Sequence, residues 1–224
     1  MKDVAKKEST ELSMENDIGF WGQNESSSND IVIPKIQLMQ GLSQLVSEGK
    51  AKLGDYVDSV SKEVIGGVDK PIEAVPFHME KFYVIQKFTG RRYEYQGYEK
   101  ITPANENLPY EYEDKGQKMK RVYTRRFYVL IDGNVLPYTI DFSSTSSKSG
   151  KELATEMFVK NAMMKLPPAA SKIAIGSQVV KGEDTYAVKT IKIIGKTSSE
   201  DIKKAFDWYK TVSKSAVIDG PGEF

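Results

Sequence analysis

The sequence predicts a mainly β fold of the α+β class with two helices. Segments rich in β-branched and aromatic residues recur between residues 31 and 194, separated by Gly, Pro, Asn and Asp, a pattern typical of strands joined by turns. Two stretches, at about 150–165 and 199–212, instead carry apolar residues at helical spacing. With 39% apolar residues, including 12 Tyr, 9 Phe and 2 Trp, the 224-residue chain can bury the core of one domain.

The chain divides into one domain and two tails. Residues 1–30 hold three Lys against seven acidic residues, and residues 214–224 hold one Lys against two. We therefore expect a disordered acidic N-terminal tail and a flexible C-terminal tail around a domain at 31–213. Because the whole chain has a net charge of +1, this domain is left near +6. Ile18, Phe20 and Trp21 form an apolar island in the N-terminal tail, which either packs on the domain or docks on another protein.

The most distinct predicted element is a β-hairpin. Its strands, 121–131 and 135–142, are joined by Asp132-Gly133-Asn134, which tolerates a positive φ. Pro34 makes the segment 31–40 an edge strand or an extended lead-in, because proline cannot donate to a strand ladder. The other elements are, in order, a short strand near Tyr56, a long strand within 72–98, a loop at 99–119, a helix at 150–165 stopped by Pro167, strands at 171–180 and 185–194, and a helix at 199–212.

Three strands, a helix and two further strands follow one another in the order of an OB-fold. We therefore predict an OB-fold-like five-stranded barrel with extra N-terminal strands and a C-terminal helix. OB-folds bind oligonucleotides on strands two and three, which here form the hairpin, between the loops that join strands one to two and four to five. Those two loops are 99–119 and 181–184. An α+β sandwich with helices on one sheet face fits the same pattern.

All five arginines lie in one aromatic block with eight of the twelve tyrosines. Guanidinium groups bind phosphates and stack on rings, and tyrosines present flat faces to bases, so the block predicts a surface for a single nucleic-acid strand. The alternative is a solvated sheet face in which arginine stems cover tyrosine rings. Because neighbouring residues on a strand face opposite sides, at least one arginine is structural. The candidate binding residues are Tyr83, Arg91, Arg92, Tyr93, Tyr95, Lys120, Arg121, Tyr123, Arg125, Arg126 and Tyr128.

Composition argues against an enzyme. The chain has no Cys and a single histidine, His78, so we predict no catalytic site, no metal and no cofactor. The segment SSKSGKE at 146–152 lacks the first glycine and the Ser/Thr of a phosphate-binding P-loop. The N-terminus has no apolar signal region and no apolar run is long enough to cross a bilayer, so we expect a cytoplasmic protein.

Four short motifs are shared with a known family. They are the lead I-P-K-I-x-L-x-Q-G at 33–41, the block GKAKLGDY at 49–56, the aromatic strand after Pro71, and the helix end at Lys165-Leu166-Pro167. Over roughly residues 31–195 the chain thus resembles a family of tailed-bacteriophage proteins related to phage single-stranded DNA-binding proteins. The resemblance implies a non-enzymatic protein that coats single-stranded DNA in phage replication or recombination, inside the infected cell. The alternative hypothesis is a protein-binding module, such as a virion component or an inhibitor of a host enzyme, that uses the same Arg/Tyr surface.

The C-terminus carries a second candidate site, formed by Asp219, Glu223 and Phe224. It resembles the acidic tails, ending in an aromatic residue, of replication single-stranded DNA-binding proteins. A terminal Phe beside its own carboxylate offers a partner one apolar group and one anion. We therefore predict that replication or recombination proteins dock here, against the alternative of a mobile end without a role. The sequence leaves open whether the protein is a homo-oligomer.

Overall fold

The computed structural model of the chain describes residues 32–214. The predicted tail at 1–30, with its apolar island, lies outside this range, as do Asp219, Glu223 and Phe224. Within it the elements are β1 Ile36–Leu38, α1 Gln44–Ser47, β2 Tyr56–Asp58, β3 Val64–Gly66, β4 Ile72–Phe88, β5 Tyr93–Lys100, β6 Glu111–Asp114, β7 Gln117–Ile131, β8 Tyr138–Ser143, the 3-10 helix η3 Ser144–Ser146, α2 Ser147–Thr155, the π-helical turn η4 Glu156–Lys160, α3 Asn161–Met163, the 3-10 helix η5 Pro168–Ala170, β9 Ser171–Val180, β10 Tyr186–Lys196 and α4 Ser199–Lys214.

An open, antiparallel seven-stranded sheet forms the centre of the molecule. Its strands follow the order β10-β9-β4-β7-β6, with β5 also paired to β4 and β8 also paired to β7. A second sheet of three short strands has the order β1-β2-β3. The structure therefore confirms the mainly β, α+β class. The first predicted helix is a succession of α2, η4 and α3, the second is α4, and the four-residue helix α1 was not predicted.

Each side of the large sheet buries its own set of apolar side chains. On one side, here called the α2 side, Phe127 and Phe142 pack with Leu153 and Met157 from the α2–η4 stretch and with Ile36 of β1. On the other, the α4 side, the neighbouring strand residues Tyr128 and Leu130 pack with Val75 of β4 and with Ala205 and Val212 of α4. Because side chains alternate along a strand, β7 contributes to both cores.

The predicted closed barrel is not confirmed. Four strand pairs of the predicted order are present, namely β4–β7, β7–β8, β4–β9 and β9–β10. The closing pair, β8 with β10, is absent from the part of the chain that the structure describes.

The N-terminal strand and α2 occupy the place where the barrel would close. Lys35 forms a parallel bridge with Thr139 of β8, and the amide of Thr139 donates to the carbonyl of Pro34. On the other flank, the Gln40 side chain donates to the carbonyl of Ala187 in β10 at 2.9 Å and accepts from its amide at 3.0 Å. Helix α2 packs against both β8 and β10. The gap between the two strands is thereby filled without a direct ladder.

The segment 99–119 is a correction to the sequence analysis, which predicted one long loop. Strand β5 continues to Lys100 and β6 begins at Glu111, so the irregular part is only 101–110. Strand β6 turns into β7 through Lys115 and Gly116, which both have a positive φ. The acidic run that indicated a loop is an edge strand, where charged side chains are common because they discourage pairing with another chain. No helix within residues 32–214 is long and apolar enough to cross a membrane.

Candidate nucleic-acid interface

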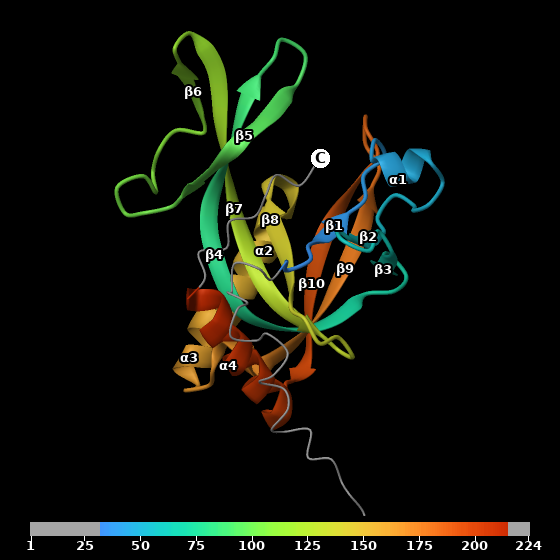
Figure 1. Cartoon of the computed structure of the whole chain (residues 1–224), viewed down its shortest axis with the longest axis vertical. Helices are drawn as coiled ribbons and strands as arrows, with labels where there is room; N and C mark the ends of the chain where they lie inside the picture. The colour runs from blue at the N-terminus through green and yellow to red at the C-terminus, as the bar shows by residue number, and fades with distance from the viewer. Residues whose placement is uncertain (1–31, 215–224) are drawn as a thin grey trace, which may run out of the picture.

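Half of the large sheet projects beyond the packed body. We call residues 80–125 the arm; it contains the outer parts of β4 and β7, with β5 paired to β4 and β6 paired to β7. Figure 1 shows the arm at the top, with β4 and β7 continuing into it from the body and the helices α3 and α4 below. Eight tyrosines and all five arginines of the sequence lie between Tyr83 and Tyr128, so the predicted aromatic block is this arm and the first residues of the body.

A bulge in β5 gathers three tyrosines on one face of the arm. Tyr98 is opposite Val84 and Tyr95 is opposite Gln86, with a register shift between Ile85 and Gln86. Gly97, whose φ is 143°, provides the left-handed backbone that this extra residue requires. Strict alternation would send Tyr95 and Tyr98 to opposite faces. With the bulge, they share the α4 side of the sheet.

The resulting surface, here called the aromatic face, consists of Phe82, Phe88, Tyr93, Tyr95 and Tyr98. Ring centroids are 5.2 Å apart for Phe88 and Tyr93, 6.0 Å for Tyr95 and Tyr98, and 5.6 Å for Phe82 and Tyr98. Phe88 and Tyr98 keep 37% and 40% of their surface exposed. The face is therefore a row of four partly exposed rings, next to the buried ring of Phe82, at the separations usual for aromatic pairs.

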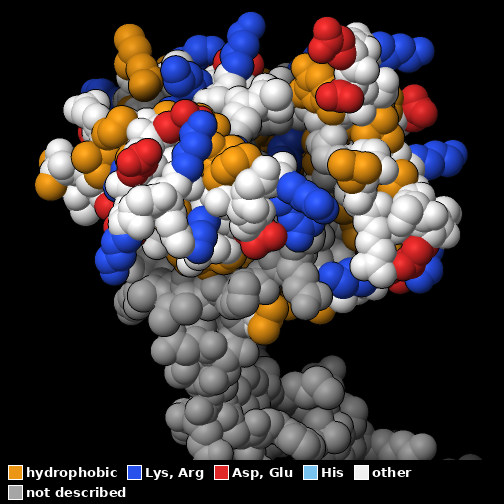
Figure 2. Space-filling model, turned by 90° about the horizontal axis from the view of Figure 1, so that it is seen from above, with side chains coloured by type: hydrophobic (Ala, Val, Ile, Leu, Met, Phe, Trp, Pro, Cys, Tyr) orange, Lys and Arg blue, Asp and Glu red, His pale blue; other side chains and the backbone are white. Residues whose placement is uncertain are grey.

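Cations border the aromatic face. The Lys120 ammonium lies 3.8 Å from the centre of the Tyr93 ring. Lys100 is opposite Phe82 in the ladder, on the same face, and is exposed. Arg91 and Arg92 are exposed in the turn between β4 and β5, where Arg92 Nε lies 3.2 Å from Glu94 Oε1. Cations therefore lie at both ends of the row of rings on β5. Figure 2, which looks down on the molecule, shows hydrophobic side chains at the surface among Lys, Arg and acidic residues.

The opposite face of the arm, here called the arginine face, carries Tyr112, Arg121, Tyr123 and Arg125. The guanidinium of Arg121 lies 3.6 Å from the centre of the Tyr112 ring, and its Nε is 3.5 Å from Glu99 Oε2. Arg125 stacks over Tyr123 at 4.5 Å. Only 15% of the Arg121 side chain is exposed. These two guanidinium groups are therefore already stacked within the protein.

Three of the predicted binding residues are buried and serve the fold. Tyr83 is 4% exposed and donates from its hydroxyl to the carbonyls of Asn105 at 3.2 Å and Glu106 at 2.7 Å, which holds the 101–110 loop on β4. Tyr128 is fully buried and donates to Glu80 Oε2 at 3.0 Å. Because a buried ring cannot stack on a base, we leave both out of the interface.

Arg126 is the third of these residues, and it holds the largely buried carboxylate of Asp141, whose side chain is 14% exposed. It is 6% exposed and makes a two-pronged pair with Asp141, Nε to Oδ1 at 2.8 Å and Nη2 to Oδ2 at 3.1 Å. Lys35 Nζ lies 2.8 Å from Asp141 Oδ2 on its other side. Burial alone would raise the pKa of Asp141, but the charges of Lys35 and Arg126 and their hydrogen bonds hold it well below its usual range. Arg126 is thus the structural arginine that strand alternation requires.

The surface expected from an OB-fold is not open in this structure. The β7–β8 pairing runs from Thr124 to Val129 on β7, and those residues are mostly buried because α2 covers one side and α4 the other. The exposed aromatic surface lies instead on β5, farther out on the arm. Sequence reasoning missed Phe88, Tyr98 and Lys100. The signal for them was the Gly97 bulge, which is visible in the sequence only as a glycine between tyrosines.

One known protein family matches the chain. The sequence model of the family described as Pam3 phage gp34-like protein matches residues 3–217. A search of curated proteins and a search of solved structures gave no match. Since the match covers nearly the whole sequence, it confirms that the chain belongs to a phage protein family, as the motifs indicated, but it shows no relation to single-stranded DNA-binding proteins. The chain belongs to the Pam3 phage gp34-like protein family.

Proposed function

We propose that this protein binds single-stranded DNA in a phage replication or recombination system, without catalysing a reaction. The observation that carries the proposal is the aromatic face, a row of partly exposed rings bordered by Lys and Arg. Proteins that bind single strands with little sequence preference combine aromatic rings, on which bases stack, with cations along the backbone path. Each stacked base contributes about 1–3 kcal/mol.

The strand runs along the β5 edge of this face in our proposal. On the β6 side the same face carries Glu111 and Glu113, and Glu111 Oε2 lies 3.5 Å from Lys118 Nζ. Carboxylates repel phosphates, whereas Lys100, Arg91 and Arg92 on the β5 side attract them. The charge distribution therefore favours a path that crosses Tyr98 and Tyr95 and ends at Tyr93, whose hydroxyl donates to Glu111 Oε1 at 3.4 Å on the border with β6.

The aromatic face suits a nucleic-acid strand better than the arginine face. On the arginine face, both arginines, Arg121 and Arg125, already lie over a ring, Tyr112 and Tyr123. On the aromatic face Lys120 lies over Tyr93 in the same way, but the cations Arg91, Arg92 and Lys100 are exposed. Releasing the two arginines of the arginine face would cost the stacking energy of each pair. We therefore assign Arg121, Tyr123 and Arg125 to bracing the arm, and Arg91, Arg92, Tyr93, Tyr95 and Lys120 to the strand.

The test is binding of a fluorescently labelled oligothymidine of about 20 nucleotides, longer than the ~4–16 nucleotides covered by one OB-fold, measured by anisotropy over a range of salt concentrations. Binding is expected at low salt, and log K should fall with log[salt] with a slope of about −0.7 for each phosphate contacted. A duplex of the same length should bind more weakly, because its bases are not free to stack. Absence of binding to any oligonucleotide at low salt would refute the proposal and leave the aromatic face to a protein partner.

A further inference from the structure

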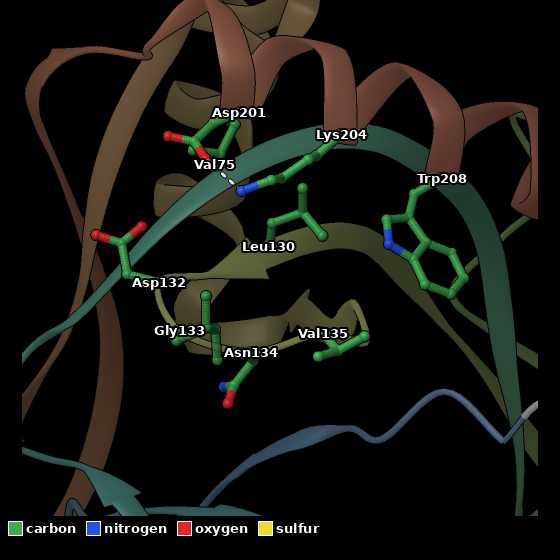
Figure 3. Close-up of a pocket in the computed structure, with 10 residues that line it drawn as sticks. Val75, Leu130, Asp132, Gly133, Asn134, Val135, Asp201, Lys204 and Trp208 are labelled. Atoms are coloured by element: carbon green, nitrogen blue, oxygen red, sulfur yellow. Dashed lines mark ion pairs between the residues drawn. The ribbon is translucent and has the colours of Figure 1, made fainter. Parts of the chain in front are cut away.

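A pocket lies between the β7–β8 turn and α4, away from the arm. Its volume is about 620 Å³, and its apolar wall consists of Val75, Leu130, Ile131, Val135 and Trp208. Figure 3 shows these side chains between the helix and the turn, with Asp201 and Lys204 at one end. Val135 is 84% exposed. A pocket of this size lies in the range in which proteins bury ligands, about 300–1,000 Å³, and one side of it is an exposed valine.

The described chain begins beside this pocket. Ile33 packs against the apolar cluster that contains Val75 and Leu130, and Trp208 packs against the same cluster. Val32, the first described residue, is 71% exposed. The described chain therefore begins next to the pocket.

The N-terminal segment contains an apolar group that matches such a pocket. Ile18, Phe20 and Trp21 stand together among polar and acidic residues. Trp21 and Val32 are 11 positions apart, so the connecting chain can span up to about 36 Å, at ~3.3 Å for each residue. A segment tethered this closely binds at an effective concentration in the mM range, so modest apolar contacts suffice to hold it.

We propose that the segment Ile18–Trp21 docks into this pocket of its own chain. Its large side chains cover Val135 and Trp208, and the adjacent Ile33 extends the same apolar contact. Burial of the aromatic rings against Leu130 and Val75 supplies the driving force, because aromatic side chains bury about 150–250 Å² each.

The two tryptophans of the chain, Trp21 and Trp208, report on this contact. The full-length protein is labelled with 5-fluorotryptophan, and the Trp21→Phe variant assigns the two fluorine resonances. Docking predicts that the Trp21 resonance is shifted from its position in urea and that this shift is unchanged on dilution. The Val135→Lys variant should return the Trp21 resonance to its position in urea, because an ammonium in the pocket wall expels the apolar side chains. Val60→Lys is the matched control, since Val60 is 61% exposed and lies in the turn after β2.

Three outcomes would overturn the proposal. A Trp21 resonance already at its urea position in the native protein means that the segment is not docked. A Trp21 resonance that is shifted in the native protein and stays shifted in the Val135→Lys variant means that the segment docks at a different site. A shift that vanishes on dilution assigns the pocket to the segment of a second copy.

Discussion

The body and the arm are built on the same two strands, β4 and β7, and differ in what covers them. In the body, Phe127, Tyr128 and Val129 are fully buried because α2 packs on one side of the sheet and α4 on the other. In the arm, β5 and β6 extend beyond the helices that the structure describes (Figure 1), and β5 has no fully buried residue. The comparison teaches that arginines and tyrosines close together in sequence lie in opposite environments: Arg126 and Tyr128 are buried in the body, whereas the tyrosines of β5 and the arginines of the turn before it lie partly or fully at the surface.

The largest expected effect falls on the body. Arg126→Ala should lower the free energy of unfolding by about 3–5 kcal/mol, because it leaves the buried Asp141 carboxylate without its two-pronged partner. Urea denaturation measures this change. The control is Arg92→Ala in the arm turn, an exposed arginine whose loss should cost no more than about 0.5 kcal/mol. Equal effects of the two substitutions would contradict the distinction between body and arm.

The dependence of stability on pH should show the contribution of the Asp141 carboxylate. The pKa of Asp141 is lowered in the folded protein and is about 3.9 in the unfolded chain. Its contribution to stability is therefore fully present above about pH 4 and is lost as the pH falls through the folded pKa. Asp141→Asn should remove this part of the acid destabilisation, measured by urea denaturation between about pH 5 and 2.5. If the free energy of unfolding of the variant fell with pH as steeply as that of the unmodified protein, protonation of Asp141 would not be the cause of the acid destabilisation.

On the arm, the expected effect is on binding and not on stability. Tyr98→Ala should weaken oligothymidine binding by about 1–3 kcal/mol, or roughly 5- to 150-fold, because one stacked base loses its ring. Tyr110→Ala is the matched control: Tyr110 is 54% exposed, and its backbone carbonyl accepts from the amide of Arg121, so it continues the β6–β7 ladder opposite a residue of the arginine face. Comparable losses in both variants would mean that binding does not distinguish the two faces. Thermal unfolding of each variant confirms that the fold is retained.

The smallest expected effect concerns the loop at the edge of the arm. Tyr83→Phe removes the hydroxyl that donates to the carbonyls of Asn105 and Glu106, at a cost of about 0.5–1.5 kcal/mol. Hydrogen exchange should show faster labelling of 101–110 with little change in the β7–β8 pairing. Labelling of this loop that is no faster in the variant would mean that other contacts hold it.

Much of the fold could be predicted because its elements are local. A turn at Asp132-Gly133-Asn134 is present, with a positive φ at Gly133, and β9 has the predicted bounds. The second strand of the hairpin begins at Tyr138 and not at the predicted Val135, so the connection between the strands is longer than predicted. Barrel closure could not be predicted, because it depends on whether β8 reaches β10 or another segment intervenes. Lys35 and Gln40 belong to the motif at 33–41 that the chain shares with a phage family. Both hold β1 in the gap between β8 and β10.

The stretch of sequence that holds the candidate site could be predicted, but the side of the sheet on which each residue lies could not. Composition indicated the aromatic block, because stacking residues are recognisable by type. The faces were not recognisable, because a single inserted residue at a bulge reverses the alternation of every later position. Burial of Arg126 likewise depends on Asp141, 15 residues away on the next strand, and on Lys35 from the N-terminal strand.

The central claim is that a single strand lies on the aromatic face. The most direct measurement is photocrosslinking of the full-length protein to an oligonucleotide that carries 5-bromodeoxyuridine, followed by mass spectrometry of the crosslinked peptides. We predict crosslinks at Tyr93, Tyr95 and Tyr98, with yields that fall as salt is added. Crosslinks confined to Tyr112 and Tyr123 on the arginine face, or to α4, would contradict the account.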